Sequence, residues 1–438
     1  SETVRLQVLQ LHPQAATYLP VANPIPVAET AAISPGELME VLDQTPRLSA
    51  SGQSGWTYEL IRAVTTDDEA KSKAAELLTL LIKGKLEMPH AWLSSRLVLL
   101  PKSGGGVRPL AIGESWTRLA GRILAKRTVT AASNRLQPVQ FGIGVKGGVE
   151  IAAHLVQTAA RVALQEDPEF VVQTVDFANA FNCVSRMAIH EQVATHLPEL
   201  LPYFRWAYGG PAPLYFGNRF VVNASSGVRQ GDPLGPLLFS MALQPVLLNM
   251  RERFARVDVV AYLDDVFLMG KREEVQAAFE FLLEQAEHIG LNVRNDKSHL
   301  VDQHSSELIA LGTPIGPSGE EELERLLRSK AAVLDEILSF DVRHAFSMLQ
   351  ASVSSRPMYW ARTTLPELGV AAFASFDDAV DNALINLSGG SNQSLSEVAK
   401  AIRHLPAHLG GWDFVDSGLS DGLVGHLRIP LPFREQSS

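Results

Sequence analysis

The sequence has one cysteine, no long apolar run and no start typical of a secreted protein. Cys183 has no partner for an internal disulfide or for a zinc site made of cysteines. No apolar run approaches the roughly 18 residues that span a bilayer, and the N-terminus lacks the basic start and apolar stretch of a signal peptide. These absences predict an intracellular protein that is not bound to membranes, in nucleus or cytoplasm. Cys183 is then a small core residue, which we favour, or a reactive thiol.

Length and charge predict a globular chain of several parts with an anionic partner. Its 438 residues exceed the roughly 250 to 300 at which a single core stops growing. The formal charge of −10 has the wrong sign for a protein that coats nucleic acid. Residues 83–146, however, hold eleven Lys or Arg against two Glu, a net charge of +9. This local basic block predicts a partner that carries phosphate.

Local patterns predict more helices than strands. Residues 1–33 show no regular period and are predicted to form an extended arm, and a capping box at Ser34 predicts a helix to about Gln44. Apolar residues that recur every three or four positions predict helices at about 56–65, 70–83, 115–131, 147–165, 185–196, 234–252, 272–289 and 319–339. Strands are predicted at 96–102 and 108–112, as a hairpin, and at 170–177, 215–222, 257–263 and 266–270, with a linker at 315–319.

Three aspartates lie at the ends of predicted strands. Asp176 follows an apolar strand in FVVQTVDF, and Asp264 and Asp265 lie between two apolar runs in AYLDDVFLMG. A two-residue hairpin turn at Asp264 and Asp265 explains that pair by itself, because aspartate favours tight turns. If the strands are neighbours in one sheet, however, the carboxylates raise one another's pKa unless a cation lies between them. Mg²⁺ suits carboxylate ligands, and two ions about 4 Å apart support in-line phosphoryl transfer.

A glycine-rich loop, SSGVRQGDPLGPLLF, lies between these strands at 225–239. Its glycines permit close backbone approach, although capping of the following helix explains them equally well. Taken in order, TVDFANAF, RQGDPLGP and AYLDD resemble the palm motifs of reverse transcriptases, most closely those of non-LTR retrotransposons. Further segments that resemble this family, over roughly residues 34–415, are SGQSGWTYELI, LVLLPKSGGGVRPLAI, GLNVRNDKS, LIALGTPIG, SSRPMYWARTTLP and LPAHLGGWDF.

The resemblance implies an α+β fold, that of a right-hand polymerase with fingers, palm and helical thumb. The palm would be an antiparallel sheet with packed helices. The implied division is an N-terminal arm at 1–33, fingers at 34–165, palm at 166–314 with a fingers insertion at about 200–235, and a helical thumb with a C-terminal segment at 315–438.

The resemblance also implies a role for individual residues. Asp176 and Asp264 would hold two Mg²⁺ or Mn²⁺ ions, with the Phe177 carbonyl as a further ligand and Asp265 in support. Phe181 would exclude a ribose 2′-hydroxyl, although its alternative is a core aromatic. Gln230 and Gly231 would line the nascent base pair, Lys102 and Arg108 would contact the triphosphate of a dNTP, and Lys297 would protonate the leaving pyrophosphate. Outside such motifs, a lone Lys or Arg is usually a solvated surface charge.

Spacing gives a separate indication of nucleic-acid binding. Arg118, Arg122 and Lys126 recur every four residues within the basic block, so they form one stripe on a predicted helix. A template backbone is the expected partner, and a solvated outer face is the alternative. Further phosphate contacts are expected in the thumb region from Arg325, Arg328, Lys330, Arg343, Arg356 and Arg362.

Two functional hypotheses follow. The first is an RNA-directed DNA polymerase, in which a primer 3′-hydroxyl attacks the α-phosphate of a dNTP on an RNA or DNA template. The second is a domesticated, polymerase-like binding or assembly protein without turnover, which has little reason to keep costly unpaired carboxylates. An RNA-dependent RNA polymerase is disfavoured by Phe181. His404 and His408 lack a cysteine partner, so no zinc site is expected there. Longer members of the family carry an endonuclease, and the formal charge here is −10, so the resemblance implies a protein partner that supplies endonuclease or extra nucleic-acid affinity.

Overall fold

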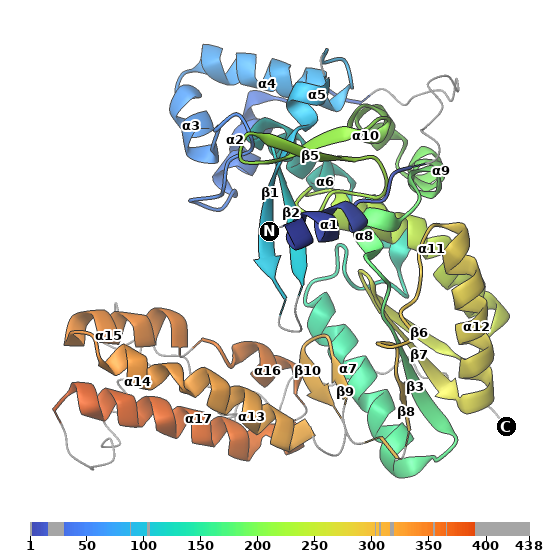
Figure 1. The fold of residues 1–438 in the computed structure, drawn as a ribbon, viewed down its shortest axis with the longest axis vertical. Helices are drawn as coiled ribbons and strands as arrows, with labels where there is room; N and C mark the ends of the chain where they lie inside the picture. The colour runs from blue at the N-terminus through green and yellow to red at the C-terminus, as the bar shows by residue number, and fades with distance from the viewer. Residues whose placement is uncertain are drawn as a thin grey trace. The chain divides into compact units, whose positions relative to one another are not determined.

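The computed structural model describes residues 2–15, 30–87, 89–102, 106–302, 304–305, 308–315, 319–353, 355–364 and 366–389. Helices and sheets are both present, so the predicted α+β class is confirmed (Figure 1). The chain forms two compact units: the first combines residues 1–148 with 173–299, and the second combines 149–172 with the described residues from 300 onward. The bounds of arm, fingers, palm and thumb stay a prediction. Within the described ranges, no helix has the length and apolar character needed to cross a membrane.

The first unit begins with a helix where an extended arm is predicted. Helix α1 (Glu2–Gln10) buries Val8, which is 2% exposed, against a cluster that includes Leu97 and Leu214. The prediction of an extended arm is therefore wrong for α1, because tertiary packing stabilises a helix that has little local amphipathic pattern. Residues 16–29 of the predicted arm lie outside the described residues.

Most other helices of the first unit confirm the predicted positions. At the start of α2, the Ser34 hydroxyl accepts a hydrogen bond from the Glu37 amide at 3.2 Å, as the capping box requires. Helices α5, α8 and α10 are too short to show a helical period and were not predicted. The bounds are α2 (Pro35–Asp43), α3 (Tyr58–Val64), α4 (Asp68–Ile82), α5 (Pro89–Leu93), α6 (Ser115–Leu136), α8 (Ala180–Cys183), α9 (Arg186–His196), a 3₁₀ turn (Pro198–Leu200), α10 (Leu201–Tyr208), α11 (Gly235–Arg253) and α12 (Arg272–His288).

The basic hairpin predicted from the sequence forms half of a four-stranded sheet with the order β2-β1-β4-β5. Strands β1 (Ser95–Pro101) and β2 (Val107–Gly113) are antiparallel, with residues 103–105 between them outside the described part. Strand β4 (Ala212–Phe216) is parallel to β1 and antiparallel to β5 (Arg219–Ala224). This sheet therefore joins strands that precede β3 (Phe170–Val175) along the chain with strands that follow it.

The second sheet brings the aspartate-bearing segments together. Its strand order is β6-β7-β3-β8, so β3 (Phe170–Val175) lies beside β7 (Asp265–Lys271), which is antiparallel to β6 (Asp258–Tyr262). Strand β3 starts in the second unit and ends in the first, and β8 spans Leu300–Val301. The sequence analysis expected Asp176 and the pair Asp264 and Asp265 to lie on neighbouring strands. The pairing of β3 with β7 agrees with that expectation.

The second unit is mostly helical. Helices α13, α14 and α17 lie side by side (Figure 1). The core between them includes Leu323, Leu327, Phe373 and Phe376. The single helix predicted at 319–339 is two helices. The bounds are α7 (Gly148–Arg161), a π-helical segment (Val162–Glu166), β9 (Leu308–Ala310), β10 (Thr313–Ile315), α13 (Gly319–Ala331), α14 (Val333–Leu338), α15 (Val342–Met348), a second π-helical segment (Leu349–Val353), α16 (Met358–Thr363) and α17 (Pro366–Leu387).

Candidate active site

A tight turn between β6 and β7 carries Asp264. Tyr262 pairs with Asp265 across the ladder, so the two turn residues are Leu263 and Asp264. The predicted turn at Asp264 and Asp265 is wrong by one position, because Asp265 already belongs to β7. Leu263 has a left-handed backbone with φ +55°. A leucine rarely adopts this conformation, and strained residues of this kind persist where the surrounding structure holds them.

Gln140 holds this strained turn. Its Oε1 accepts a hydrogen bond from the Leu263 amide at 2.7 Å, and its Nε2 donates to the Leu263 carbonyl at 3.1 Å. The side chain is fully buried, and the neighbouring backbone pairs with β6 through Phe141 and Ala261 at 2.8 Å. The sequence analysis did not identify Gln140, because its partner lies 123 positions further along the chain and no local spacing marks it. We assign Gln140 as a positioning residue for Asp264.

A backbone ladder fixes Asp176 at the end of β3. The Arg294 amide donates to the Asp176 carbonyl at 2.7 Å, and the Ala178 amide donates to the Asn292 carbonyl at 2.7 Å. These two hydrogen bonds flank Phe177 and use neither of its backbone groups. Residues 290–298, which resemble the lysine-bearing palm motif, therefore lie against Asp176. Neither of these two hydrogen bonds uses the Phe177 carbonyl.

The three carboxylates are close enough to change one another's ionisation. Burial raises the pKa of Asp264, Asp176 raises it further, and the Arg108 charge opposes both. Burial, followed by repulsion from Asp264 and Asp176, raises the pKa of Asp265 to about 6, although this residue keeps solvent-exposed surface. The structure thus brings Asp176, Asp264, Asp265 and Arg108 together at one corner of the second sheet.

This corner fits a divalent cation. Across the described residues, no three His, Cys, Asp or Glu side chains are grouped as ligands of one ion. Mg²⁺ at phosphoryl-transfer sites needs fewer protein ligands, since one or two carboxylates suffice and water and substrate phosphates complete the shell. Asp176, Asp264 and the Phe177 carbonyl supply that number. The raised pKa of Asp264 is the expected result for carboxylates with too little positive charge nearby.

The glycine-rich loop packs against the segment that follows Asp176. The Val228 amide donates to the Phe181 carbonyl at 2.7 Å, and a Cβ on Gly227 would lie 2.2 Å from that same oxygen. The Phe181 ring stacks on Phe239 with centroids 4.8 Å apart, and Phe181 is only half-buried. Phe181 therefore combines a packing contact with accessible surface.

Gln230 and Gly231 lie where this loop meets β2. The Ala111 amide donates to the Gln230 carbonyl at 2.7 Å. Gly231 has φ +121°, and a Cβ there would lie 2.7 Å from the Ala111 carbonyl oxygen, so this approach requires glycine. Strand β2 thus carries both Arg108 and the contact to the loop.

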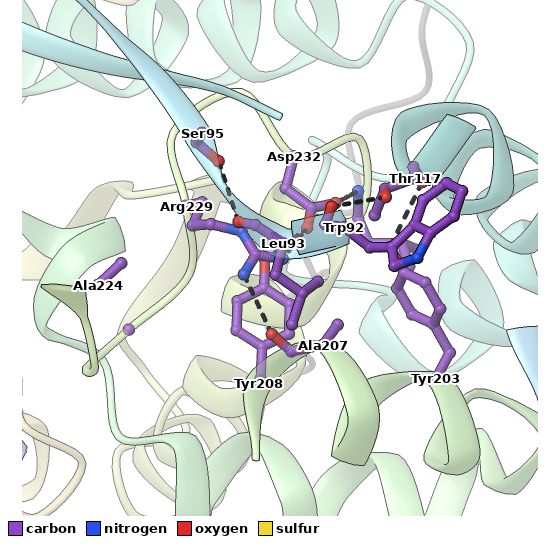
Figure 2. Close-up of polar contacts among 12 residues, drawn as sticks. Trp92, Leu93, Ser95, Thr117, Tyr203, Ala207, Tyr208, Ala224, Arg229 and Asp232 are labelled. Carbon is purple, nitrogen blue, oxygen red and sulfur yellow. Dashed lines mark hydrogen bonds and ion pairs between the residues drawn. The ribbon is translucent and has the colours of Figure 1, made fainter. Parts of the chain in front are cut away.

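Two buried arginines hold the loop in place, and the sequence analysis missed both. Arg229 lies 4.4 Å from the centre of the Tyr208 ring and donates to Asp232 at 3.3 Å (Figure 2). The Tyr208 hydroxyl donates to the same carboxylate at 2.6 Å. The Arg186 guanidinium donates at 2.9 to 3.4 Å to five backbone carbonyls, those of Tyr208, Gly210, Ala224, Ser226 and Gly227. No spacing in the sequence marks these contacts, because they join α9, α10 and the loop.

The three cations of the predicted basic stripe on α6 contact different residues of the chain. Arg118 and Arg122 lie over the Tyr58 ring, 5.1 and 5.9 Å from its centre. Lys126 is instead paired with Glu40. The helical spacing therefore predicted a shared face correctly, but the three cations do not form one solvated row.

Lys102, Lys297, Arg356 and Arg362 are exposed. No contact among the described residues brings Lys102 or Lys297 to the carboxylates, and the Lys102 amide closes the hairpin by donating to Gly106 at 3.2 Å. In the second unit, Arg362 is paired with Glu150 at 2.9 Å, and Arg356 is exposed. His404 and His408 lie outside the described residues.

The structure brings together carboxylates at the ends of neighbouring strands, a basic hairpin strand and a glycine-rich loop, which is the arrangement that the resemblance implied for a polymerase palm. Residues 100–315 match the family model described as reverse transcriptase (RNA-dependent DNA polymerase). The chain carries a reverse transcriptase domain, and the family predicted from the sequence is confirmed.

Several proteins of retrotransposable elements are similar to this chain. The 132 kDa protein of the element SLACS from Trypanosoma brucei gambiense is 25% identical over 390 residues, which are 83% of this chain and 32% of that protein. The Pol polyprotein of the type-1 element R2 from Nasonia vitripennis is 27% identical over 285 residues, 61% of this chain and 27% of that protein. The chain thus spans about a third of these relatives or less. A solved telomerase from Candida albicans has 10% identity and a TM-score of 0.41, covering 68% of this chain and 61% of that chain.

Proposed function

We propose that this chain copies RNA into DNA, as the polymerase part of a retrotransposon protein. The observation that carries the proposal is the corner of Asp176, Asp264 and Asp265, which lies inside the matched residues 100–315. The primer 3′-hydroxyl would attack the α-phosphate of a dNTP, and pyrophosphate would leave. Catalysis of this kind depends mainly on positioning and charge neutralisation.

Asp176, Asp264 and the Phe177 carbonyl would hold two Mg²⁺ or Mn²⁺ ions, with Asp265 in support. When bound, these ions neutralise charge on the attacking and leaving oxygens. The position of Arg108 beside Asp264 supports a contact to the dNTP triphosphate. Lys102 would join that contact from the same hairpin, and Lys297 would protonate the pyrophosphate.

Gln230 and Gly231 would line the nascent base pair, since their loop is held against β2 and carries no side chain at Gly231. Phe181 would exclude a ribose 2′-hydroxyl and so favour dNTPs. Its half-buried ring, backed by Phe239, is a rigid surface suited to that exclusion.

The template strand and primer would lie on basic side chains. Arg118, Arg122, Lys126, Arg356 and Arg362 are the proposed contacts, and binding through phosphates would be salt-dependent. Because the matched part is only 32% and 27% of these relatives' own length, endonuclease activity and additional affinity would come from other segments or from a protein partner.

Primer extension tests the proposal. The chain is offered a primer on an RNA or a DNA template, with dNTPs or NTPs, and with Mg²⁺ or Mn²⁺. We expect extension with dNTPs on RNA, abolished in Asp264→Asn and retained in Asp258→Asn, a matched change at the opposite end of β6. Extension that survives Asp264→Asn would refute the assignment of the site. Binding of primer and template without extension under any condition would favour the non-catalytic assembly protein, and preference for NTPs would favour an RNA polymerase.

A further inference from the structure

Two arginines lie over one buried tyrosine in the first unit, and a third arginine is close to one of them. Arg118 and Arg122 approach the Tyr58 ring from α6. Arg96, on β1, is close to Arg118: burial lowers the pKa of Arg118, and the charges of Arg122 and Arg96 lower it further. These residues come from three elements, so the tertiary fold gathers them rather than the period of one helix.

The cluster contains buried donor atoms that have no acceptor among the described residues. Tyr58 is fully buried and its hydroxyl has no partner, and the same holds for the Nε atoms of Arg96, Arg118 and Arg122. The Arg118 terminal nitrogen does donate to the Ala50 carbonyl at 2.6 Å. Buried donors are normally satisfied, so these four unsatisfied donors favour an acceptor that binds from outside the chain.

One acid, Glu114, offsets only part of the three guanidinium charges of this cluster in the described part of the chain. Glu114 is the carboxylate that attracts Arg118. Both of its oxygens, however, accept hydrogen bonds from Ser54, one from the amide at 2.9 Å and one from the hydroxyl. Like charges held together disfavour their own charged state unless a counter-ion lies between them. A ligand for this cluster must therefore be an anion that accepts several hydrogen bonds.

We propose that Tyr58, Arg96, Arg118 and Arg122 form a phosphate-binding site, and that its occupant is a backbone phosphate of bound nucleic acid. Guanidinium groups present donors in a fixed fork that matches phosphate oxygens, and the tyrosine hydroxyl adds one more donor. The site lies within the basic block of residues 83–146, except for Tyr58. This site rests on the proposed function, because the template or the primer supplies the phosphate. It adds Tyr58 and Arg96 to the phosphate contacts already proposed on α6.

Salt dependence of binding tests the site without turnover. The full chain binds a labelled primer–template in anisotropy measurements at several KCl concentrations, with no nucleotide present. Because K falls as salt rises, the slope of log K against log[salt] is negative, and losing one phosphate contact should make it less steep by about 0.7 to 0.9. We expect this change for Arg122→Gln and for Arg96→Gln. Tyr58→Phe should keep the slope and weaken binding about tenfold, the loss of one hydrogen bond to a charged group.

Two matched variants make the result specific. Arg135→Gln removes the same charge from the same helix, where Arg135 donates to His196 at 3.2 Å, and should keep the wild-type slope. Arg122→Lys keeps the charge and should also keep the slope, with weaker binding because the fork is lost. Circular dichroism confirms folding of each variant. Slopes of Arg122→Gln and Arg96→Gln equal to that of Arg135→Gln would overturn the proposal.

A titration with inorganic phosphate distinguishes a site for backbone phosphate of nucleic acid from a site for free phosphate. At constant ionic strength, phosphate should raise the melting temperature of the wild type but not of Arg122→Gln. A phosphate effect without a change of slope would overturn the nucleic-acid assignment and leave a site for free phosphate. Absence of both effects would overturn the site itself. Because no measurement here uses nucleotide incorporation, failure of the polymerase proposal would appear only in primer extension.

Discussion

Replacing Tyr208 by phenylalanine isolates one hydrogen bond beneath the glycine-rich loop. The change removes the hydroxyl that donates to Asp232 at 2.6 Å and keeps the ring on which Arg229 and Arg186 lie, 4.4 and 5.2 Å from its centre. Tyr208 is fully buried, so bulk water cannot replace the lost donor. Burial and the nearby Asp232 charge raise the pKa of Tyr208, which agrees with a neutral hydroxyl that donates to a carboxylate.

The expected cost follows from these contacts. A hydrogen bond to a charged group contributes about 1.5 to 3 kcal/mol to the free energy of unfolding. A cavity of about 20 Å³ is lined by Asp232 and Arg229 among others, and it has room for about one water molecule. A water there would offset part of the loss, so we expect a decrease of about 1.5 to 2 kcal/mol.

Urea unfolding followed by tryptophan fluorescence measures this decrease. Tyr203→Phe is the matched control, because Tyr203 is on the same helix, is 1% exposed, and donates only weakly to the Thr117 carbonyl at 3.5 Å. It should cost less than about 1 kcal/mol. Since Asp232 flanks Gln230 and Gly231, Tyr208→Phe should also raise KM for dNTP more than it lowers kcat. Equal stability of the two variants would refute the role assigned to the Asp232 contact.

Three further predictions concern the loop, the turn and pH. Gly227→Ala should lower the free energy of unfolding by more than about 3 kcal/mol or prevent folding, because its Cβ would lie 2.2 Å from a carbonyl oxygen. The control is Gly217→Ala, a position with φ +58° and open surroundings. This control should lower the free energy of unfolding, measured with urea, by only about 1 to 2 kcal/mol. Gln140→Met should reduce the rate of single-turnover incorporation at least tenfold, which corresponds to an increase of about 1.4 kcal/mol in the activation barrier. Its effect on the affinity for dNTP should be smaller. An unchanged incorporation rate would refute the role of Gln140 in positioning Asp264. Burial and the Arg205 charge lower the pKa of His190, so the folded state binds fewer protons than the unfolded chain, and stability should fall as pH decreases below 6.5. His190→Gln should weaken that decline in urea unfolding at several pH values.

The sequence predicted what depends on short-range patterns. The capping box at Ser34, the apolar periods of α6 and α12, and the alternation of glycine and strand residues around the hairpin each reflect physics within a few residues. Cys183 is only half-buried, and burial raises the pKa of its thiol, which disfavours a reactive thiolate. The three aspartates were found because carboxylates at the ends of apolar strands are conspicuous.

The contacts that hold the site were not predictable in the same way. Gln140 binds a residue 123 positions away, and Arg186 binds carbonyls from three segments. Helix α1 depends on Val8 meeting a sheet formed much later in the chain. The turn was placed one residue late because aspartate is common at both turn positions, and only the pairing of Tyr262 with Asp265 distinguishes them.

Metal binding tests the central claim, that Asp176 and Asp264 form one site for paired divalent ions. Mn²⁺ is titrated into the chain with primer–template and a nonhydrolysable dNTP, and free Mn²⁺ is followed by electron paramagnetic resonance. Wild type and Asp258→Asn should bind two ions per chain, and Asp264→Asn should lose at least one or bind both at least tenfold more weakly. Two ions bound by Asp264→Asn with wild-type affinity would contradict the account.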